Sequence, residues 1–330
     1  MQEVRSTGAR WMTWVAVALG IAGCVRAGFG VAGSSDAGPV DVGRDHRPDA
    51  SSDRGSVADR SADQALPADP LAPFGAPKVV AELGSSLDED DPTLTSDMLE
   101  IHFDRDGDVW RATRPSVSAA WETPQPVTEV NTAGVETSPE VSADGLTLFL
   151  ATNRSHTLAK GAYDIFVSTR ASRADPWSEP APVAELNSAF EDFPGGTTSD
   201  LQAIIFPSKR PGGPGNDDLH VATRDSATSA WSVPNLVSEL NSTLNDSSPW
   251  LSADGLVVYL DRGAAGGTDG RSIWVATRGA AGDPFSTPTI LIGGIDSPQR
   301  DTDPWLSPDL HTIYFCSNRT GDQEIYVATR

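Results

Sequence analysis

The chain has 330 residues and carries a formal net charge of −22, with a pI near 4.4. An acidic chain lacks the clustered lysine and arginine that a groove for nucleic-acid phosphates needs, so no nucleic-acid partner is expected. With only two cysteines, Cys24 and Cys316, the sequence also excludes a fold held together by several disulfide bonds.

The N-terminal residues predict an export signal. Two arginines precede an apolar run over residues 11–22, which is too short to span a bilayer comfortably and is typical of a secretory signal peptide. The run ends in Ile21-Ala22-Gly23-Cys24, which resembles the lipobox of bacterial lipoproteins, with Ile in place of the usual Leu. The resemblance implies a signal peptide over residues 1–23 and acyl chains on Cys24. These would anchor the protein to a membrane of the cell envelope, facing the periplasm or the outer membrane. The alternative is an ordinary signal peptide with an incidental cysteine.

Residues 24–70 predict a disordered tether. They are rich in Asp, Ser, Ala, Gly and Pro and show no hydrophobic periodicity. A segment of this composition cannot bury enough apolar surface to order itself. We therefore expect it to hold the globular part, residues 71–330, away from the membrane.

The globular part repeats one pattern, which is clearest from Asp246 to Asp296. Asp254-Gly255 is a hairpin-turn dipeptide, and it stands directly before the apolar run over residues 256–260. A second run covers residues 273–277, and a further short strand follows a Pro–aromatic pair. Four short antiparallel strands cannot bury both of their faces alone, so the unit must stack on copies of itself.

Three landmarks recur in the same order in five copies. The proline that opens the first strand recurs as Pro92, Pro139, Pro194, Pro249 and Pro304, at spacings of 47, 55, 55 and 55 residues. The turn aspartate recurs as Asp97, Asp144, Asp200, Asp254 and Asp309. The third strand ends at Arg114, Arg170, Arg224, Arg278 and Arg330. Repetition at this period, with four strands in each unit, predicts a β-propeller.

The two ends of the globular part complement each other. Residues 73–85 match only the fourth-strand motif of the other copies, whereas the last copy stops at Arg330, after its third strand. An N-terminal strand that completes the last blade would cover an open sheet edge. The sequence therefore predicts an all-β fold, a five-bladed β-propeller closed by its N-terminal strand.

The repeats resemble the WD-like repeats of TolB-type β-propellers. The matching motifs are Pro249–Gly255, Pro304–Asp309, Ser317–Arg319 and Asp164–Val167. The resemblance implies the fold, because such propellers serve as scaffolds, binders and enzyme domains. TolB itself usually has six blades and an extra N-terminal domain, neither of which this sequence predicts.

Charged residues recur at one rim of the predicted ring, which we call the acid rim. Three residues before each opening proline lies an acid: Glu89, Glu136, Glu191, Asp246 and Asp301. Each second strand ends in an arginine: Arg105, Arg154, Arg210, Arg262 and Arg319. In four copies the third strand begins with another acid. Because an arrangement that repeats in every blade is typical of structure, we interpret it as a brace in which one arginine joins two acids. The alternative is a ring of carboxylates that holds a cation.

Residues that break the repeat mark a candidate binding rim. They are Asp90, Asp91, Asp106, Asp192 and Phe193. The acid rim also carries the longest loops, whereas the opposite rim is expected to offer short turns with little room for specificity.

One short segment of the first blade resembles part of a Ca²⁺-binding loop. It runs from Asp104 to Asp108. Within it Asp106-Gly107 also fits a tight hairpin, which is the favoured interpretation. No cofactor is predicted, with Ca²⁺ the one candidate metal.

The leading functional hypothesis is an envelope-anchored binding or protein-interaction scaffold. It would act as a monomer on an envelope protein or a glycan. One alternative is a five-bladed carbohydrate-active enzyme, whose carboxylates would come from different blades. The other is a Ca²⁺-dependent adhesion module.

Overall fold

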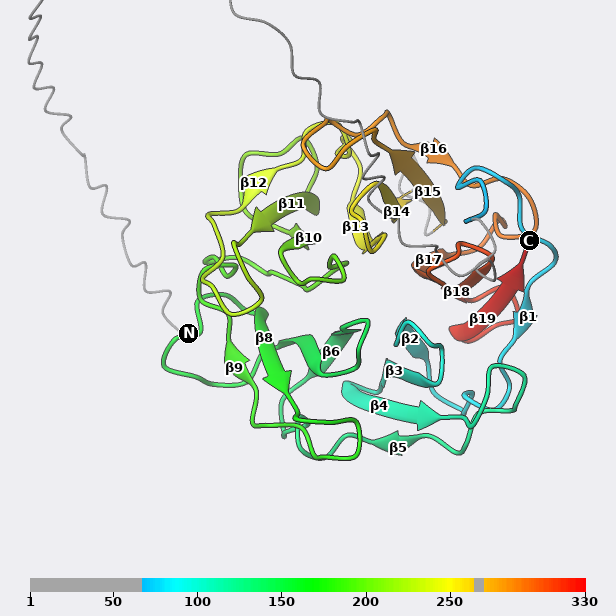
Figure 1. The fold of residues 1–330 in the computed structure, drawn as a ribbon, viewed down its shortest axis with the longest axis horizontal. Coiled ribbons are helices and arrows are strands. Elements are labelled where there is room, and N and C mark those ends of the chain that lie inside the picture. Colours follow the sequence, from blue (N-terminus) through cyan, green and yellow to red (C-terminus); the bar gives the residue numbers. More distant parts are fainter. Residues whose placement is uncertain (1–66, 264–269) are drawn as a thin grey trace, which may run out of the picture. The chain divides into compact units, whose positions relative to one another are not determined.

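The computed structural model describes residues 67–263 and 270–330. The predicted signal peptide, Cys24 and most of the predicted tether lie outside these residues. The described elements are all strands, and they form five antiparallel sheets arranged in a ring (Figure 1). In this part of the chain no helix is long and apolar enough to cross a membrane. The prediction of an all-β, five-bladed propeller is confirmed.

Three blades have three long strands and a short outer strand. The first contains β2 (Glu89–Leu94), β3 (Glu100–Arg105), β4 (Asp108–Thr113) and β5 (Gln125–Pro126). The second contains β6 (Glu136–Val141), β7 (Thr147–Thr152), β8 (Asp164–Thr169) and β9 (Ala181–Pro182). The fourth contains β13 (Asp246–Leu251), β14 (Val257–Gly263), β15 (Arg271–Thr277) and β16 (Thr289–Ile290). The first strand of each blade faces the centre of the ring, and the short strand lies outside (Figure 1).

The third blade departs from this plan. It contains β10 (Ala203–Ser208), β11 (Asp218–Thr223) and β12 (Asn235–Leu236), while its innermost segment pairs with β10 only through isolated bridges. That segment includes Gly195-Gly196, where the chain passes close to its neighbours. A Cβ atom on Gly196 would lie 2.2 Å from the backbone nitrogen of Leu251, and the N–H of Gly196 donates to the Pro249 carbonyl at 2.6 Å. The glycines therefore let the third blade bond directly to the first strand of the fourth.

The fifth blade is completed by the N-terminal strand. It combines β17 (Asp301–Leu306), β18 (Thr312–Ser317) and β19 (Glu324–Thr329) with β1 (Lys78–Val79), which pairs antiparallel with β19. The guanidinium of Arg330 lies 4.1 Å from the ring centroid of Phe74. The same contact recurs in the other blades, as Arg114–Trp121, Arg170–Trp177, Arg224–Trp231 and Arg278–Phe285. Phe74 thus supplies the aromatic residue that the fifth blade lacks, and the predicted closure is confirmed.

Packing onto the propeller begins earlier than residue 71, where the predicted tether ended. The N–H of Ala68 donates to the carbonyl of Asp309 at 2.9 Å. The Pro70 carbonyl accepts from the Tyr259 hydroxyl at 2.5 Å and from Arg330 at 3.1 Å. The segment is held by these backbone hydrogen bonds and by Ala68, which packs against the core. It is too short to show a hydrophobic period in the sequence.

Candidate functional site

One arginine in each blade fastens the acid rim. Its guanidinium pairs with a carboxylate at the start of the first strand and donates to a backbone carbonyl in the loop that enters this strand. The pairs, with their N–O distances, are Arg105–Glu89 (2.7 Å), Arg154–Glu136 (3.1 Å), Arg210–Asp192 (2.6 Å), Arg262–Asp246 (2.5 Å) and Arg319–Asp301 (2.5 Å). All five acids are fully buried. We call each such set a brace; together they fix the frame that carries the rim loops.

The third blade corrects one predicted brace residue. Glu191 was predicted to pair with Arg210, but the partner is Asp192, while Glu191 pairs with Lys209 nearer the surface. In the other blades two residues separate the brace acid from the opening proline, whereas in the third blade only Phe193 separates Asp192 from Pro194. A prediction that counts three residues back from the proline therefore selects Glu191, one position before the true acid. The acid lies eight residues before the turn aspartate in every blade, and that spacing would have found Asp192.

Two of the predicted second brace acids, Asp164 and Asp218, have other partners. Asp164 accepts from the backbone N–H groups of Lys160 and Gly161, and Asp218 accepts from that of Gly215. None of the ion pairs within residues 67–263 and 270–330 joins a brace arginine to an acid of the third strand. A brace therefore consists of one arginine, one acid and one carbonyl, while Asp164 and Asp218 order rim loops instead.

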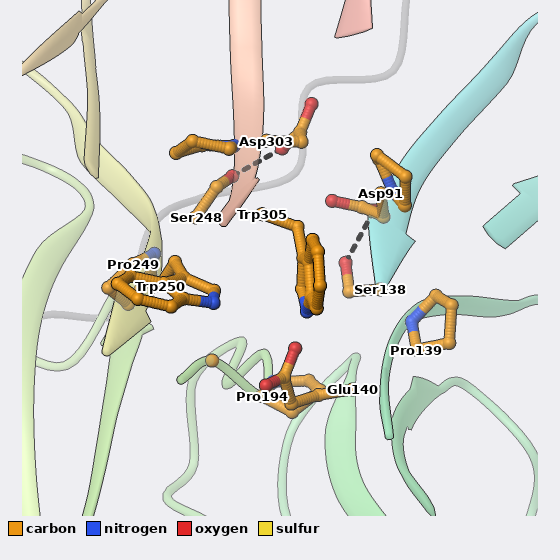
Figure 2. Close-up of a pocket in the computed structure, with 13 residues that line it drawn as sticks. Asp91, Ser138, Pro139, Glu140, Pro194, Ser248, Pro249, Trp250, Asp303 and Trp305 are labelled. Atoms are coloured by element: carbon orange, nitrogen blue, oxygen red, sulfur yellow. Dashed lines mark hydrogen bonds between the residues drawn. The ribbon is translucent and has the colours of Figure 1, made fainter. Parts of the chain in front are cut away.

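Two aspartates meet at the axis of the ring, where they line a chamber of about 40 Å³. Asp91 and Asp303 hold equivalent places in the first and fifth blades, with φ of 53° and 54°. Asp91 accepts from the Ser138 hydroxyl at 2.9 Å, and Asp303 accepts from the Ser248 hydroxyl at 2.5 Å (Figure 2). The third blade contributes Pro194, which has neither an N–H group nor a polar side chain to donate a hydrogen bond. The chamber is thus asymmetric: Asp91 and Asp303 come from the first and fifth blades and Glu140 from the second, whereas the third and fourth blades contribute no acid.

Asp90 joins these aspartates in one hydrogen-bonded group. Burial raises the pKa of Asp90 and of Asp91 well above the ordinary value, and the charge of Asp303 raises both further. Burial opposes the charged form of Asp303 too, but hydrogen bonds from the other two aspartates and from hydroxyl groups hold its pKa below the ordinary value. The negative charge of the group is therefore accommodated best on Asp303.

The same cluster contains the residues best placed to hold a metal ion. Among the described residues, Asp90, Asp303 and Cys316 form a group whose ligand atoms all lie within 4.8 Å of one another. Carboxylates suit a hard cation such as Ca²⁺, which takes about six to eight oxygen ligands. Burial raises the pKa of the Cys316 thiol well above its ordinary value, so the thiol does not add a negative ligand at neutral pH. The donor set falls short of a Ca²⁺ cage, and Ca²⁺ binding stays a prediction.

The residues of the predicted binding rim do not form one surface. Asp90 and Asp91 lie at the axis, and Asp192 is fully buried in a brace. Phe193 stacks on Tyr163 with ring centroids 5.4 Å apart, which ties two rim loops together. These four side chains therefore belong to the axial group, to a brace and to a contact between loops, and not to one exposed surface.

Asp106 is the exposed member of the set. It lies at the tip of the β3–β4 hairpin, where Asp106 and Gly107 have φ of 52° and 79°. Two successive left-handed residues make the tight hairpin turn that the sequence favoured over a Ca²⁺ loop.

A wider hollow, which we call the cup, opens at the other mouth of the channel. Its volume is about 210 Å³, and its walls include the last residues of four first strands, Leu94, Val141, Leu251 and Leu306. Trp250, Trp305 and Glu140 line both the cup and the axial chamber, so they separate the two (Figure 2). The expectation that this face leaves little room was wrong. One feature of the sequence could have indicated a specific cavity here: the residue after the opening proline differs between most copies.

Two further buried carboxyl groups have raised pKa values. Burial raises the pKa of Glu140 to about 8, although a hydrogen bond from Thr93 opposes the shift. Burial likewise raises the pKa of Asp104 to about 7, against a hydrogen bond from Thr137. Burial therefore disfavours the charged forms of both groups.

No family model and no curated protein matches the sequence. Among solved structures, an endo-arabinase from Bacteroides thetaiotaomicron has a TM-score of 0.55 at 14% identity, over 78% of this chain and 98% of that one. A GH43_1 enzyme from Xanthomonas citri has a TM-score of 0.54 at 16% identity, over 79% of this chain and 92% of that one. TolB from Acinetobacter baumannii has a TM-score of 0.45 at 16% identity, and the chain covers 56% of its length. At these identities the likeness shows the β-propeller fold alone.

Proposed function

We propose that the protein is a binding propeller of the bacterial cell envelope, anchored through Cys24, that holds a protein partner with its acid-rim loops. The observation that carries this proposal is a pair of exposed apolar side chains, Leu158 and Phe190, which are 56% and 45% exposed. They stand on two touching loops: a Cβ atom on Gly161 would lie 2.0 Å from the Phe190 carbonyl oxygen. Exposed apolar groups on loops that a rigid frame supports are typical of protein interaction surfaces.

The path of the chain leaves this surface open. Ala68 is bonded to the turn at Asp309, which lies at the end of the fifth blade opposite the acid rim. The chain therefore reaches the propeller on the far side from Leu158 and Phe190. An anchor that precedes residue 67 would not have to cross the proposed binding surface.

The hydrolase alternative fits the axial geometry less well. A glycosidase needs two carboxyl groups on either side of a bound sugar, about 5 to 10 Å apart. Asp91 and Asp303 instead share a chamber of about 40 Å³, whereas ligand pockets measure about 300 to 1,000 Å³. The cup is larger, but Glu140 is the one carboxyl group among its described lining residues.

Crosslinking on intact cells tests the proposal. We expect the wild-type chain to form a discrete crosslinked adduct, and Leu158→Ser with Phe190→Ser to lose it at unchanged melting temperature. Val233→Ser is the matched control, because Val233 is 82% exposed and stands in the loop that enters β12, away from these residues. Equal adduct in all three proteins would reject the proposed surface. Hydrolysis of a chromogenic arabinofuranoside that disappears in Asp303→Asn would establish the enzyme alternative instead.

A further inference from the structure

The floor of the cup holds two buried tryptophans whose donors have no acceptor in the protein. Trp250 and Trp305 are 8% and 5% exposed, and their indole nitrogens point into the channel (Figure 2). The third floor group is the Glu140 carboxyl. Among the described residues, the one side-chain hydrogen bond of these three groups is donated by the Thr93 hydroxyl to Glu140 at 3.1 Å. Because buried donors are rarely left without an acceptor, the floor indicates a site for a ligand that accepts hydrogen bonds.

The floor is also where the repeat is broken. All three groups follow an opening proline, a position that holds Thr93 in the first blade and Gly195 in the third. Edge contacts to Tyr259 at 5.9 Å and to Tyr314 at 6.1 Å, between ring centroids, fix the two indoles. The donors are therefore preorganised on one side of an otherwise regular ring, as a binding site requires.

The walls and the mouth of the cup offer little free polar chemistry. Leucine and valine residues at the ends of four first strands form the walls. At the mouth, the Ser96 hydroxyl donates to the Ala143 carbonyl at 2.9 Å, and the Ser199 hydroxyl donates to the Ala253 carbonyl at 3.3 Å. A polyhydroxylated ligand such as a sugar would find few free partners there. The cup, at about 210 Å³, is smaller than a typical pocket for a whole ligand, so it fits an aliphatic stem with one polar end.

The chemistry of that polar end follows from the floor. An indole N–H can only donate a hydrogen bond. Burial raises the pKa of Glu140 to about 8, so its carboxyl group can also donate at neutral pH. No basic side chain occurs among the described residues that line the cup or the axial chamber, and Asp303 lies in the chamber behind the floor. An anionic acceptor would therefore be repelled, whereas a neutral carbonyl oxygen can accept two hydrogen bonds without a charge.

We propose that the cup binds a neutral carbonyl group at the end of an aliphatic stem. The carbonyl oxygen accepts from the indole N–H groups of Trp250 and Trp305. The stem lies against the walls, which are formed by Leu94, Val141, Leu251 and Leu306. This site is on the face opposite the acid rim, so it goes beyond the proposed protein-binding surface and does not depend on it. The carbonyl group belongs to one of two sources, an amide or an ester.

Titration of the full-length protein with N-butylacetamide at pH 7 tests the site, with the indole N–H signals in NMR spectra as the readout. We expect two indole signals to shift saturably, and these should be the two that disappear in Trp250→Phe and Trp305→Phe. n-Butylamine offers only donors at this pH, and hexanoate carries a negative charge. Each should bind at least tenfold more weakly than the amide.

The same variants test the two donors. Trp250→Phe and Trp305→Phe each keep an aromatic ring but lose the N–H group, so each should weaken binding of N-butylacetamide about threefold to tenfold. Trp231→Phe is the matched control, because Trp231 is equally buried, at 6% exposed, and lies outside the cup. It should bind the amide as the wild type does.

Three results would overturn the proposal: no saturation by N-butylacetamide, equal binding of the amide, the amine and hexanoate, or unchanged binding by folded Trp250→Phe and Trp305→Phe variants. The comparison of ligands uses wild-type protein, so it decides the matter even if a variant fails to fold. n-Butyl acetate separates the two sources, since it has the carbonyl group without the amide N–H. Binding weaker than that of N-butylacetamide indicates an amide, and binding as tight or tighter indicates an ester.

Discussion

Glu140 and Asp104 link the stability of the propeller to pH. Their pKa values of about 8 and about 7 exceed the ordinary values of 4.5 and 3.8, because burial disfavours the charged carboxylates. The stability that they contribute is complete below about pH 4 and is lost as pH rises through 7 and 8. His102 changes the stability with pH in the opposite sense, because burial lowers its pKa to about 3. It reduces the free energy of unfolding only below about pH 6.5, where the imidazole is protonated in the unfolded chain.

We therefore expect the melting temperature to fall between pH 6.5 and pH 8. Each of the two groups contributes at most about 1.4 kcal/mol per pH unit in this window. Thermal melts at closely spaced pH values should show a shallower slope for Glu140→Gln, which stays neutral throughout. Glu179→Gln, which changes an exposed acid, should keep the wild-type slope. A Glu140→Gln slope equal to that of the wild type would contradict the assignment.

The brace arginines should matter far more than exposed ones. Asp246 is fully buried and pairs with Arg262, so Arg262→Met leaves a buried charge without its partner. We expect a loss of about 3 kcal/mol of unfolding free energy in urea melts. Arg173→Met breaks the pair with Asp97, whose side chains are 31% and 42% exposed, and should cost less than about 1 kcal/mol. Equal losses in the two variants would show that the brace does not stabilise the blade.

At the scale of elements, the ring depends on the segment that carries β1. Phe74 is 4% exposed and lies under Arg330, so Phe74→Ala should destabilise the protein by about 3 kcal/mol or more. Val79 lies in β1 but is 44% exposed, and Val79→Ala should stay within about 0.5 kcal/mol. A fragment of residues 67–330 should melt cooperatively, whereas residues 86–330 should aggregate through the open edge of β19. A soluble, cooperatively melting 86–330 fragment would contradict closure.

The sequence predicts these elements because turn and strand-end residues repeat, and each has a local cause such as a hairpin dipeptide. It could not place Asp91 and Asp303, because their inward direction comes from a left-handed backbone in a bulged strand. The presence of an aspartate at these positions does not by itself predict a left-handed backbone. The cup is equally hidden, since it forms only where the ends of first strands from different blades converge. Local patterns therefore predicted the frame, the brace arginines and four of the five acids that pair with them, while the channel needed the three-dimensional ring.

At the scale of the whole molecule, the ring has two unlike faces. The acid rim presents Leu158 and Phe190 on supported loops, and the opposite face presents the cup beside the turn where Ala68 is bonded. If a lipid anchor precedes the ring, the cup face is the one to which the anchored segment connects. The proposed protein-binding surface is then the face that remains open to the surrounding compartment.

The anchor itself rests on Cys24, which lies outside the described residues and whose lipidation is proposed from the resemblance to a lipobox. Stable membrane attachment needs more than one acyl chain, and a lipidated N-terminal cysteine would supply them. We expect Cys24→Ser to move the protein from the membrane fraction to the soluble fraction of the envelope, with loss of lipid from the N-terminal peptide by mass spectrometry. Cys316→Ser changes the only other cysteine and should remain in the membrane fraction. Retention of Cys24→Ser in the membrane would show that something other than this cysteine holds the propeller there.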